Sequence, residues 1–236
     1  MRWKWSMCPN AHHGHYTTGN YHYPTIVLEA VASQALWIWN AFFASVSSLN
    51  DINILNNSPI FNKVCDNTTP DSSLIVRGTE YKFGYYLVDG IYPKVSVFVK
   101  ILSCPDDPHR SRFKRIQEKA RKYIERAFGA LKKRWQIIAK ASMFRDISTM
   151  TVVMYTCIIL HNMILKHEGN TICVYDENEI IPETQPLEYG GQEWLQIMRI
   201  IHSVVTHTDL CHHLTDHFWT MNNFDLNMPP EDELEG

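Results

Sequence analysis

The chain has 236 residues, of which 45% are hydrophobic and 20% are charged, and its formal net charge is −3. These values are typical of a soluble globular protein with a sizeable core, organised as one large domain or two small ones. The six cysteines form no Cys-x-x-Cys pair and exclude a dense disulfide framework, so we expect reduced thiols in the cytosol or nucleus. The first residues form no apolar run, and no signal peptide is expected there.

Two runs rich in β-branched and aromatic residues open the predicted fold. Residues 24–33 and 35–44 predict an antiparallel hairpin joined at Ser33-Gln34. After the hairpin, Asn50 or Asp51 is suited to cap the start of a helix.

The next part of the chain alternates between polar and apolar segments. Residues 56–83 are rich in Asn, Ser, Thr, Asp and Pro and are predicted to be loop-like. The apolar run 84–88 predicts a short strand that stops at Asp89-Gly90. Residues 105–108, Pro-Asp-Asp-Pro, predict a break before the next helix.

That helix carries most of the positive charge of the chain. Residues 110–140 hold 12 of the 22 Lys and Arg residues and only two acids, Glu118 and Glu125, so the segment is near +10. Its apolar residues recur every 3.6 positions from Phe113 to Ile138, as expected for an amphipathic helix. So basic a surface suits a polyanion, because each Lys or Arg near a phosphate displaces condensed counterions.

The C-terminal third is predicted to be mainly helical. Ser148 is expected to cap a helix that Gly169 ends. Within it, residues 150–165 are the membrane candidate, but they are too few and too polar to span a bilayer comfortably, and we predict a buried core helix. The predicted organisation is a domain over 1–168, an acidic linker over 169–192, helices over 193–220 and a disordered tail over 221–236.

Three acids stand where a cation site could form: Asp51 at a helix start, Asp89 at a strand end and Glu125 on a helix face. Carboxylates that converge from a strand end and a helix can hold divalent ions that activate water and stabilise a leaving oxygen. Each acid also has a structural explanation, as an N-cap, a turn residue and an ion-paired surface acid respectively. Position alone leaves both interpretations open.

A series of motifs in order extends over nearly the whole chain, and it resembles the transposases of the PIF/Harbinger group, particularly their plant nuclease-like relatives. The motifs are Met1-Arg-Trp-Lys-Trp5 with Cys8-Pro9 and Tyr16, Pro24 to Ala32, Leu36 to Phe43, Asn50 to Asn53 with Ser58-Pro59, Tyr86 to Pro93, Ala120 to Gly129, and Cys157 to Met163.

The resemblance implies an α/β fold of the ribonuclease-H-like type, with a mixed sheet flanked by helices and further helices at the C-terminus. It implies that Asp89 and Glu125 are catalytic and that, together with Asp51, they bind Mg²⁺ or Mn²⁺. We expect these carboxylates to approach one another. We expect Arg121, Lys122, Arg126, Lys132 and Lys133 to bind the DNA backbone.

The chain departs from the family pattern at its beginning. The family's first catalytic aspartate lies just before the motif that starts here at Met1, so the resemblance predicts a fold incomplete at the N-terminus. We therefore expect a transposase-derived, metal-dependent DNA nuclease-like protein with impaired activity, in the nucleus and not in a membrane. A Myb-like or other nuclear protein is a possible partner. The alternative is a non-catalytic nuclear module that binds DNA or chromatin proteins.

Overall fold

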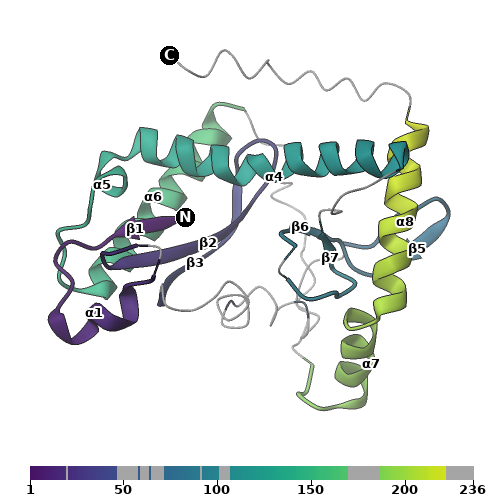
Figure 1. Ribbon diagram of the computed structural model, residues 1–236, viewed down its shortest axis with the longest axis horizontal. Helices are drawn as coiled ribbons and strands as arrows, with labels where there is room; N and C mark the ends of the chain where they lie inside the picture. Colours follow the sequence, from purple (N-terminus) through teal and green to yellow (C-terminus); the bar gives the residue numbers. More distant parts are fainter. Residues whose placement is uncertain are drawn as a thin grey trace.

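The computed structural model describes residues 1–19, 21–46, 72–90, 92–100, 107–169 and 187–221, together with Ser58 and Val64. One long helix, α4 (Pro108–Arg134), crosses the molecule and joins two groups of elements (Figure 1). The first group holds a three-stranded sheet with helices α1 (Asn10–Tyr16), α5 (Gln136–Ala139) and α6 (Ile147–His167). The second holds four short strands with helices α7 (Gln192–Ile201) and α8 (Val204–Thr220).

The three-stranded sheet contains the predicted hairpin. Strands β1 (Arg2–Lys4), β2 (Thr25–Ala32) and β3 (Ile38–Val46) are antiparallel in the order β1-β2-β3. Leu28 of β2 lies opposite Phe43 of β3, and both side chains are buried. The hairpin prediction is therefore confirmed. Its turn includes Leu36 in the left-handed region at φ 63°, which is uncommon outside glycine.

A second hairpin lies in the stretch that was predicted to be loop-like. Strands β4 (Leu74–Val76) and β5 (Thr79–Tyr81) are joined by Arg77 and Gly78, whose φ angles are 51° and 82°. Two positive φ angles are typical of a tight hairpin turn that follows the twist of the strands. The loop prediction is wrong here, because Val76 and Tyr81 become buried against α8.

The strand predicted at residues 84–88 is present as β6 (Tyr86–Val88), which pairs in parallel with β7 (Phe98–Lys100). The predicted α/β class is thus confirmed. The described strands form three separate small sheets instead of the single mixed sheet that the resemblance implied. The predicted helix start at Asn50 or Asp51, the acidic linker after Gly169 up to residue 186, and the tail after Met221 lie outside the described residues.

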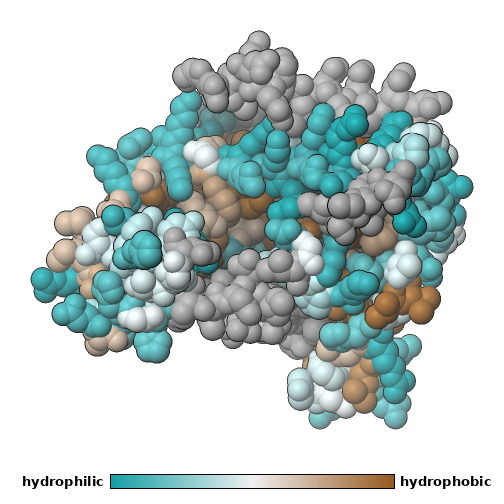
Figure 2. Space-filling model, in the orientation of Figure 1, coloured by the Kyte–Doolittle hydropathy of each residue, from teal (hydrophilic) through white to brown (hydrophobic). Residues whose placement is uncertain are grey.

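Helix α4 starts and packs as its sequence indicates. Asp107 caps it by accepting hydrogen bonds from the backbone N–H groups of His109 and Arg110, and Pro108 occupies the first turn. The 27 residues of α4 span about 40 Å at 1.5 Å per residue. Figure 2 shows its charged residues as a teal band with brown apolar surface beneath it.

Helix α6 covers the outer edge of β3. Asn162 donates to the carbonyl of Ile38 at 2.8 Å and accepts from the N–H of Ile38 at 3.0 Å, and the Tyr155 hydroxyl donates to the carbonyl of Ala41 at 3.2 Å. The helix begins after Asp146, whose carboxylate accepts from the N–H of Thr149 at 2.7 Å. The predicted cap at Ser148 is therefore wrong by two residues, because Ser148 already lies inside the first turn.

Helix α6 is long and apolar enough to span a membrane by length and composition, with 28% of its most apolar window buried. The core-helix prediction holds for one face, which includes Met150, Met154, Cys157 and Ile158. Its opposite face leaves apolar side chains exposed, among them Val152, Ile159 and Met163.

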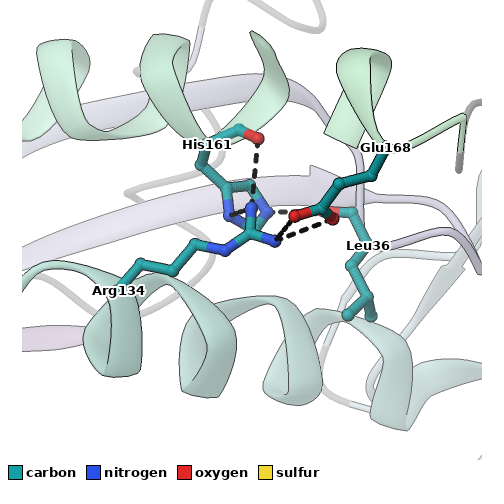
Figure 3. A network of polar contacts seen from close by, with 4 residues as sticks. All are labelled: Leu36, Arg134, His161 and Glu168. Carbon is teal, nitrogen blue, oxygen red and sulfur yellow. Dashed lines mark hydrogen bonds and ion pairs between the residues drawn. The ribbon is translucent and has the colours of Figure 1, made fainter. Parts of the chain in front are cut away.

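A buried histidine joins α4, α6 and the β2–β3 turn (Figure 3). The His161 side chain is 0% exposed, and its Nε2 donates to the carbonyl of Leu36 at 3.0 Å. Its Nδ1 accepts from Nη1 of Arg134 at 3.4 Å, while Nη2 of Arg134 binds both carboxylate oxygens of Glu168 at 3.2 and 3.1 Å. These bonds fix the neutral Nε2–H tautomer of His161.

This network predicts a loss of stability in acid. Burial lowers the pKa of His161, and the Arg134 charge acts in the same direction, while the bond to Leu36 and the Glu168 carboxylate oppose the shift. The unfolded chain therefore binds more protons than the folded chain below about pH 6.5, and stability falls as pH falls toward the lowered pKa. Urea unfolding of wild type and His161→Gln at pH 7.5 and 5.5 measures this, and the variant should lose less stability between the two values. Equal pH dependence in both proteins would contradict the assignment, and His13→Gln, on an exposed residue, controls for histidines outside the core.

Candidate nucleic-acid interface

The candidate site is built from the end of β6 and the exposed face of α4. Asp89 follows β6 directly, as predicted, and its Oδ1 accepts from the N–H of Gly90 at 2.7 Å. Its Oδ2 lies 3.4 Å from Nη2 of Arg121 on α4. The pair is largely solvent-exposed, so it contributes about 0–1 kcal/mol and can exchange partners.

Glu125 lies one helical turn after Arg121, and its side chain is exposed on α4. The contact between Asp89 and Arg121 thus brings the strand that carries one predicted acid against the helix that carries the other. The structure describes no direct contact between Asp89 and Glu125, so their approach within a shared ion site stays a prediction. Asp51 lies outside the described residues.

The two acids border neighbouring cavities. Asp89 and Arg121 line a cavity of about 630 Å³ between β2 and β6, called here the interstrand cavity, together with Glu29 to Ala32 of β2 and Tyr85 to Val88. Glu125 lines a second cavity of about 630 Å³ beside β1, called here the β1 pocket. Met1, Val27 and Phe128 line both cavities and so lie between the two acids.

The described carboxylates do not by themselves fit a divalent metal ion. Among residues 1–221 that the structure describes, no group of three or more His, Cys, Asp or Glu side chains is placed to hold a metal. Asp89 is paired with Arg121, and Glu125 opens into the other cavity. Mg²⁺ needs oxygen ligands arranged near an octahedron, and these two acids supply too few without further donors.

The basic residues predicted to bind DNA lie along α4. Lys122 and Lys133 are exposed, whereas Arg121, Arg126 and Lys132 are partly buried by their neighbours. Arg121 is the member that also pairs with Asp89. Arg121 and Lys132 border the two cavities, whereas Lys122 and Lys133 are exposed on the same helix.

Sequence reasoning missed the residues that complete the β1 pocket. Arg2 and Lys4 line it, while Trp3 between them and Trp5 after them are buried, at 2% and 1% exposure. This is the two-residue alternation of a strand. Trp3 and Trp5 therefore pack in the core, and the same alternation places the two cations together on the opposite face.

The comparisons with known proteins assign the family. A model of the family described as plant transposon protein matches residues 1–172. The chain belongs to this family. No curated protein and no solved structure matches it significantly.

A glycine on the site face of α4 yields a stability prediction. A Cβ at Gly129, one turn after Glu125, meets nothing within 4 Å among the described residues. Gly129→Ala should therefore raise the free energy of unfolding by about 1 kcal/mol, since alanine loses less entropy inside a helix. Denaturant titration measures the change, and Ala130→Gly should shift it the opposite way. A destabilised Gly129→Ala protein would show that the surface is not open.

Proposed function

We propose that this plant transposon protein is of the PIF/Harbinger type and binds DNA in the nucleus through the outer face of α4. The observation that carries the proposal is the row of cations on this helix. Residues 110–140 hold a charge near +10 in a chain whose net charge is −3. Phosphate contacts of this kind position a protein on DNA without reading its sequence.

The proposed cation site draws on three acids of the chain. In our proposal Asp89, Glu125 and Asp51 belong to a nuclease site of ribonuclease-H-like descent that would take Mg²⁺ or Mn²⁺. When bound, such ions activate water and stabilise the leaving oxygen of a phosphodiester. The described donors are too few to hold them, so we derive no cleavage step for these residues.

Met1 lies between the two proposed acids. The N–H of Leu28 donates to the carbonyl of Met1 at 2.7 Å, and the terminal amine of Met1 donates to the carbonyl of Leu28 at 2.7 Å. Met1 thus extends the β1–β2 ladder and borders both cavities. The family resemblance places an aspartate just before this point, where its carboxylate would be close to both Asp89 and Glu125.

The alternative function is a non-catalytic DNA-binding or chromatin-protein-binding module. The exposed apolar face of α6 favours some protein contact, because Val152, Ile159 and Met163 are 66, 58 and 60% exposed. A Myb-like nuclear protein remains the proposed partner class. Interaction with duplex DNA is common to both functions, and cleavage separates them.

DNA binding is tested by charge reversal. We expect Lys132→Glu with Lys133→Glu to weaken binding to duplexes of different sequence by a similar factor and to reduce the salt dependence by about two phosphate contacts. Fluorescence anisotropy between 50 and 200 mM salt measures both. A double reversal of Lys82 and Lys94 to Glu, on exposed residues outside α4, changes the net charge by the same amount and is the control. A DNA affinity that changes neither with salt concentration nor with the Lys132 and Lys133 reversals would contradict the proposal.

Catalysis is tested by adding a carboxylate donor before Met1. The chain as printed should cut DNA poorly or not at all with Mg²⁺ or Mn²⁺, because an error of about 1 Å in ligand placement already costs on the order of 100-fold in rate. A version extended before Met1 with a strand that carries an aspartate should cut faster, and its Asp→Asn form should not. Comparable cleavage by the printed chain, abolished by Glu125→Gln, would show that the acids are misassigned.

A further inference from the structure

The β1 pocket combines aromatic rings, cations and an unsatisfied hydroxyl. Tyr21 and Tyr23 lie side by side at its wall, with ring centroids 5.8 Å apart and an interplanar angle of 63°. Both remain exposed, at 37 and 38%, although tyrosine rings are usually half-covered by packing. A cation lies over each ring: the guanidinium carbon of Arg2 is 5.5 Å from the centroid of the Tyr21 ring, and Nζ of Lys4 is 4.5 Å from the centroid of the Tyr23 ring.

The opposite wall is the C-terminal half of α4. Glu125, Gly129 and Lys132, spaced at helical intervals, line the pocket from this side. Because no described residue outside the helix backbone lies within 4 Å of a Cβ at Gly129, the described structure leaves this wall open above the helix. Three cations and one carboxylate line the pocket, so its net charge is near +2.

The floor carries a buried polar group without a partner. Thr25 is 2% exposed, and its hydroxyl makes no hydrogen bond to any described residue. A buried hydroxyl left unpaired costs about 1–3 kcal/mol, so native proteins rarely keep one without a purpose or a bound partner. Thr25 lines the same pocket, but its hydroxyl oxygen is covered, so the ligand contacts proposed below come from the rings and the cations.

We propose that the β1 pocket binds unpaired nucleotides of a DNA strand. A base would stack on Tyr21 or Tyr23, and Arg2, Lys4 and Lys132 would neutralise the flanking phosphates. A volume of about 630 Å³ is within the range of ligand-binding sites. The face of a base is accessible to a tyrosine ring only where the base is not stacked on its neighbours in a duplex. The pocket should therefore select single-stranded DNA over the duplex.

The proposal rests on the proposed DNA-binding function for its ligand class and adds a strand preference. The pocket adjoins the cation row of α4 through Lys132, so a strand held on the outer helix can continue into it. Glu125 is then the carboxylate beside the bound phosphodiester. In this proposal, single-strand binding depends on Tyr21, Tyr23, Arg2 and Lys4, none of which belongs to α4.

The test compares a 12-nucleotide oligothymidylate with a 12-base-pair duplex, by fluorescence anisotropy in EDTA. Tyr21→Ala with Tyr23→Ala should weaken oligothymidylate binding by about tenfold or more, since base stacking contributes about 1–3 kcal/mol per base. Duplex affinity should change less than twofold. The Tyr→Phe double variant keeps both rings and should bind the oligothymidylate like wild type.

A second variant tests the opposite wall independently of the tyrosines. Gly129→Leu places a side chain in the open pocket and should weaken oligothymidylate binding, whereas Gly129→Ala should not. Thermal unfolding of every variant confirms that it folds.

The outcomes separate the two proposals. Loss of duplex and oligothymidylate affinity to the same extent in the tyrosine variant, or no loss of either, would overturn the pocket assignment. Wild-type binding to duplex but not to oligothymidylate would overturn it and leave the α4 proposal intact. Oligothymidylate binding without duplex binding would support the pocket and contradict the proposed duplex interface.

Discussion

The apolar stripe of α4 is the constraint on which the described structure depends. Phe113, near its start, is buried with Val76, Val99 and Leu210, whereas Leu131, near its end, is buried with residues of the β1–β3 sheet and α6. One rigid helix therefore contributes to two separate cores. Its amphipathic period does more than form a helix, because it also fixes the distance between the two groups of elements. The packing of α4 in both cores therefore fixes the positions of the side chains on its outer face.

Local patterns in the sequence predicted the elements well and their assembly poorly. Period-two runs gave the β2–β3 hairpin, and the 3.6-residue period gave α4, α7 and α8, because burial of one face decides these structures over a few residues. The β4–β5 hairpin was missed since its strands are short and gain their burial from α8, more than 120 positions later. Gln117 was likewise assigned no role, yet it is buried and donates to the carbonyl of Lys100 at 3.1 Å. Such contacts depend on the tertiary arrangement and leave no periodic signal.

The residues of the candidate site could likewise be predicted from local patterns, but their contacts could not. A strand end and a helix face were enough to identify Asp89 and Glu125 as candidates, and both lie on the expected elements. The partner of Asp89 could not be read from spacing, because Arg121 is 32 positions away and was assigned to DNA. The β1 pocket was missed although Arg2 and Lys4 alternate with buried tryptophans. Its other wall comes from α4, and only the folded chain brings the two walls together.

The exposed pair of Arg121 and Asp89 links the two uses of this surface. A guanidinium beside Asp89 offers the carboxylate a positive partner where the proposed nuclease site would offer a metal ion. The two partners disfavour each other on electrostatic grounds, since like charges within a few ångströms repel. A cation held by Asp89 would therefore favour a position of Arg121 away from this carboxylate, toward the α4 residues proposed to bind phosphates. Because the pair is solvent-exposed and weak, this exchange costs little. In the proposed function, metal binding and DNA binding would consequently favour each other through a single arginine.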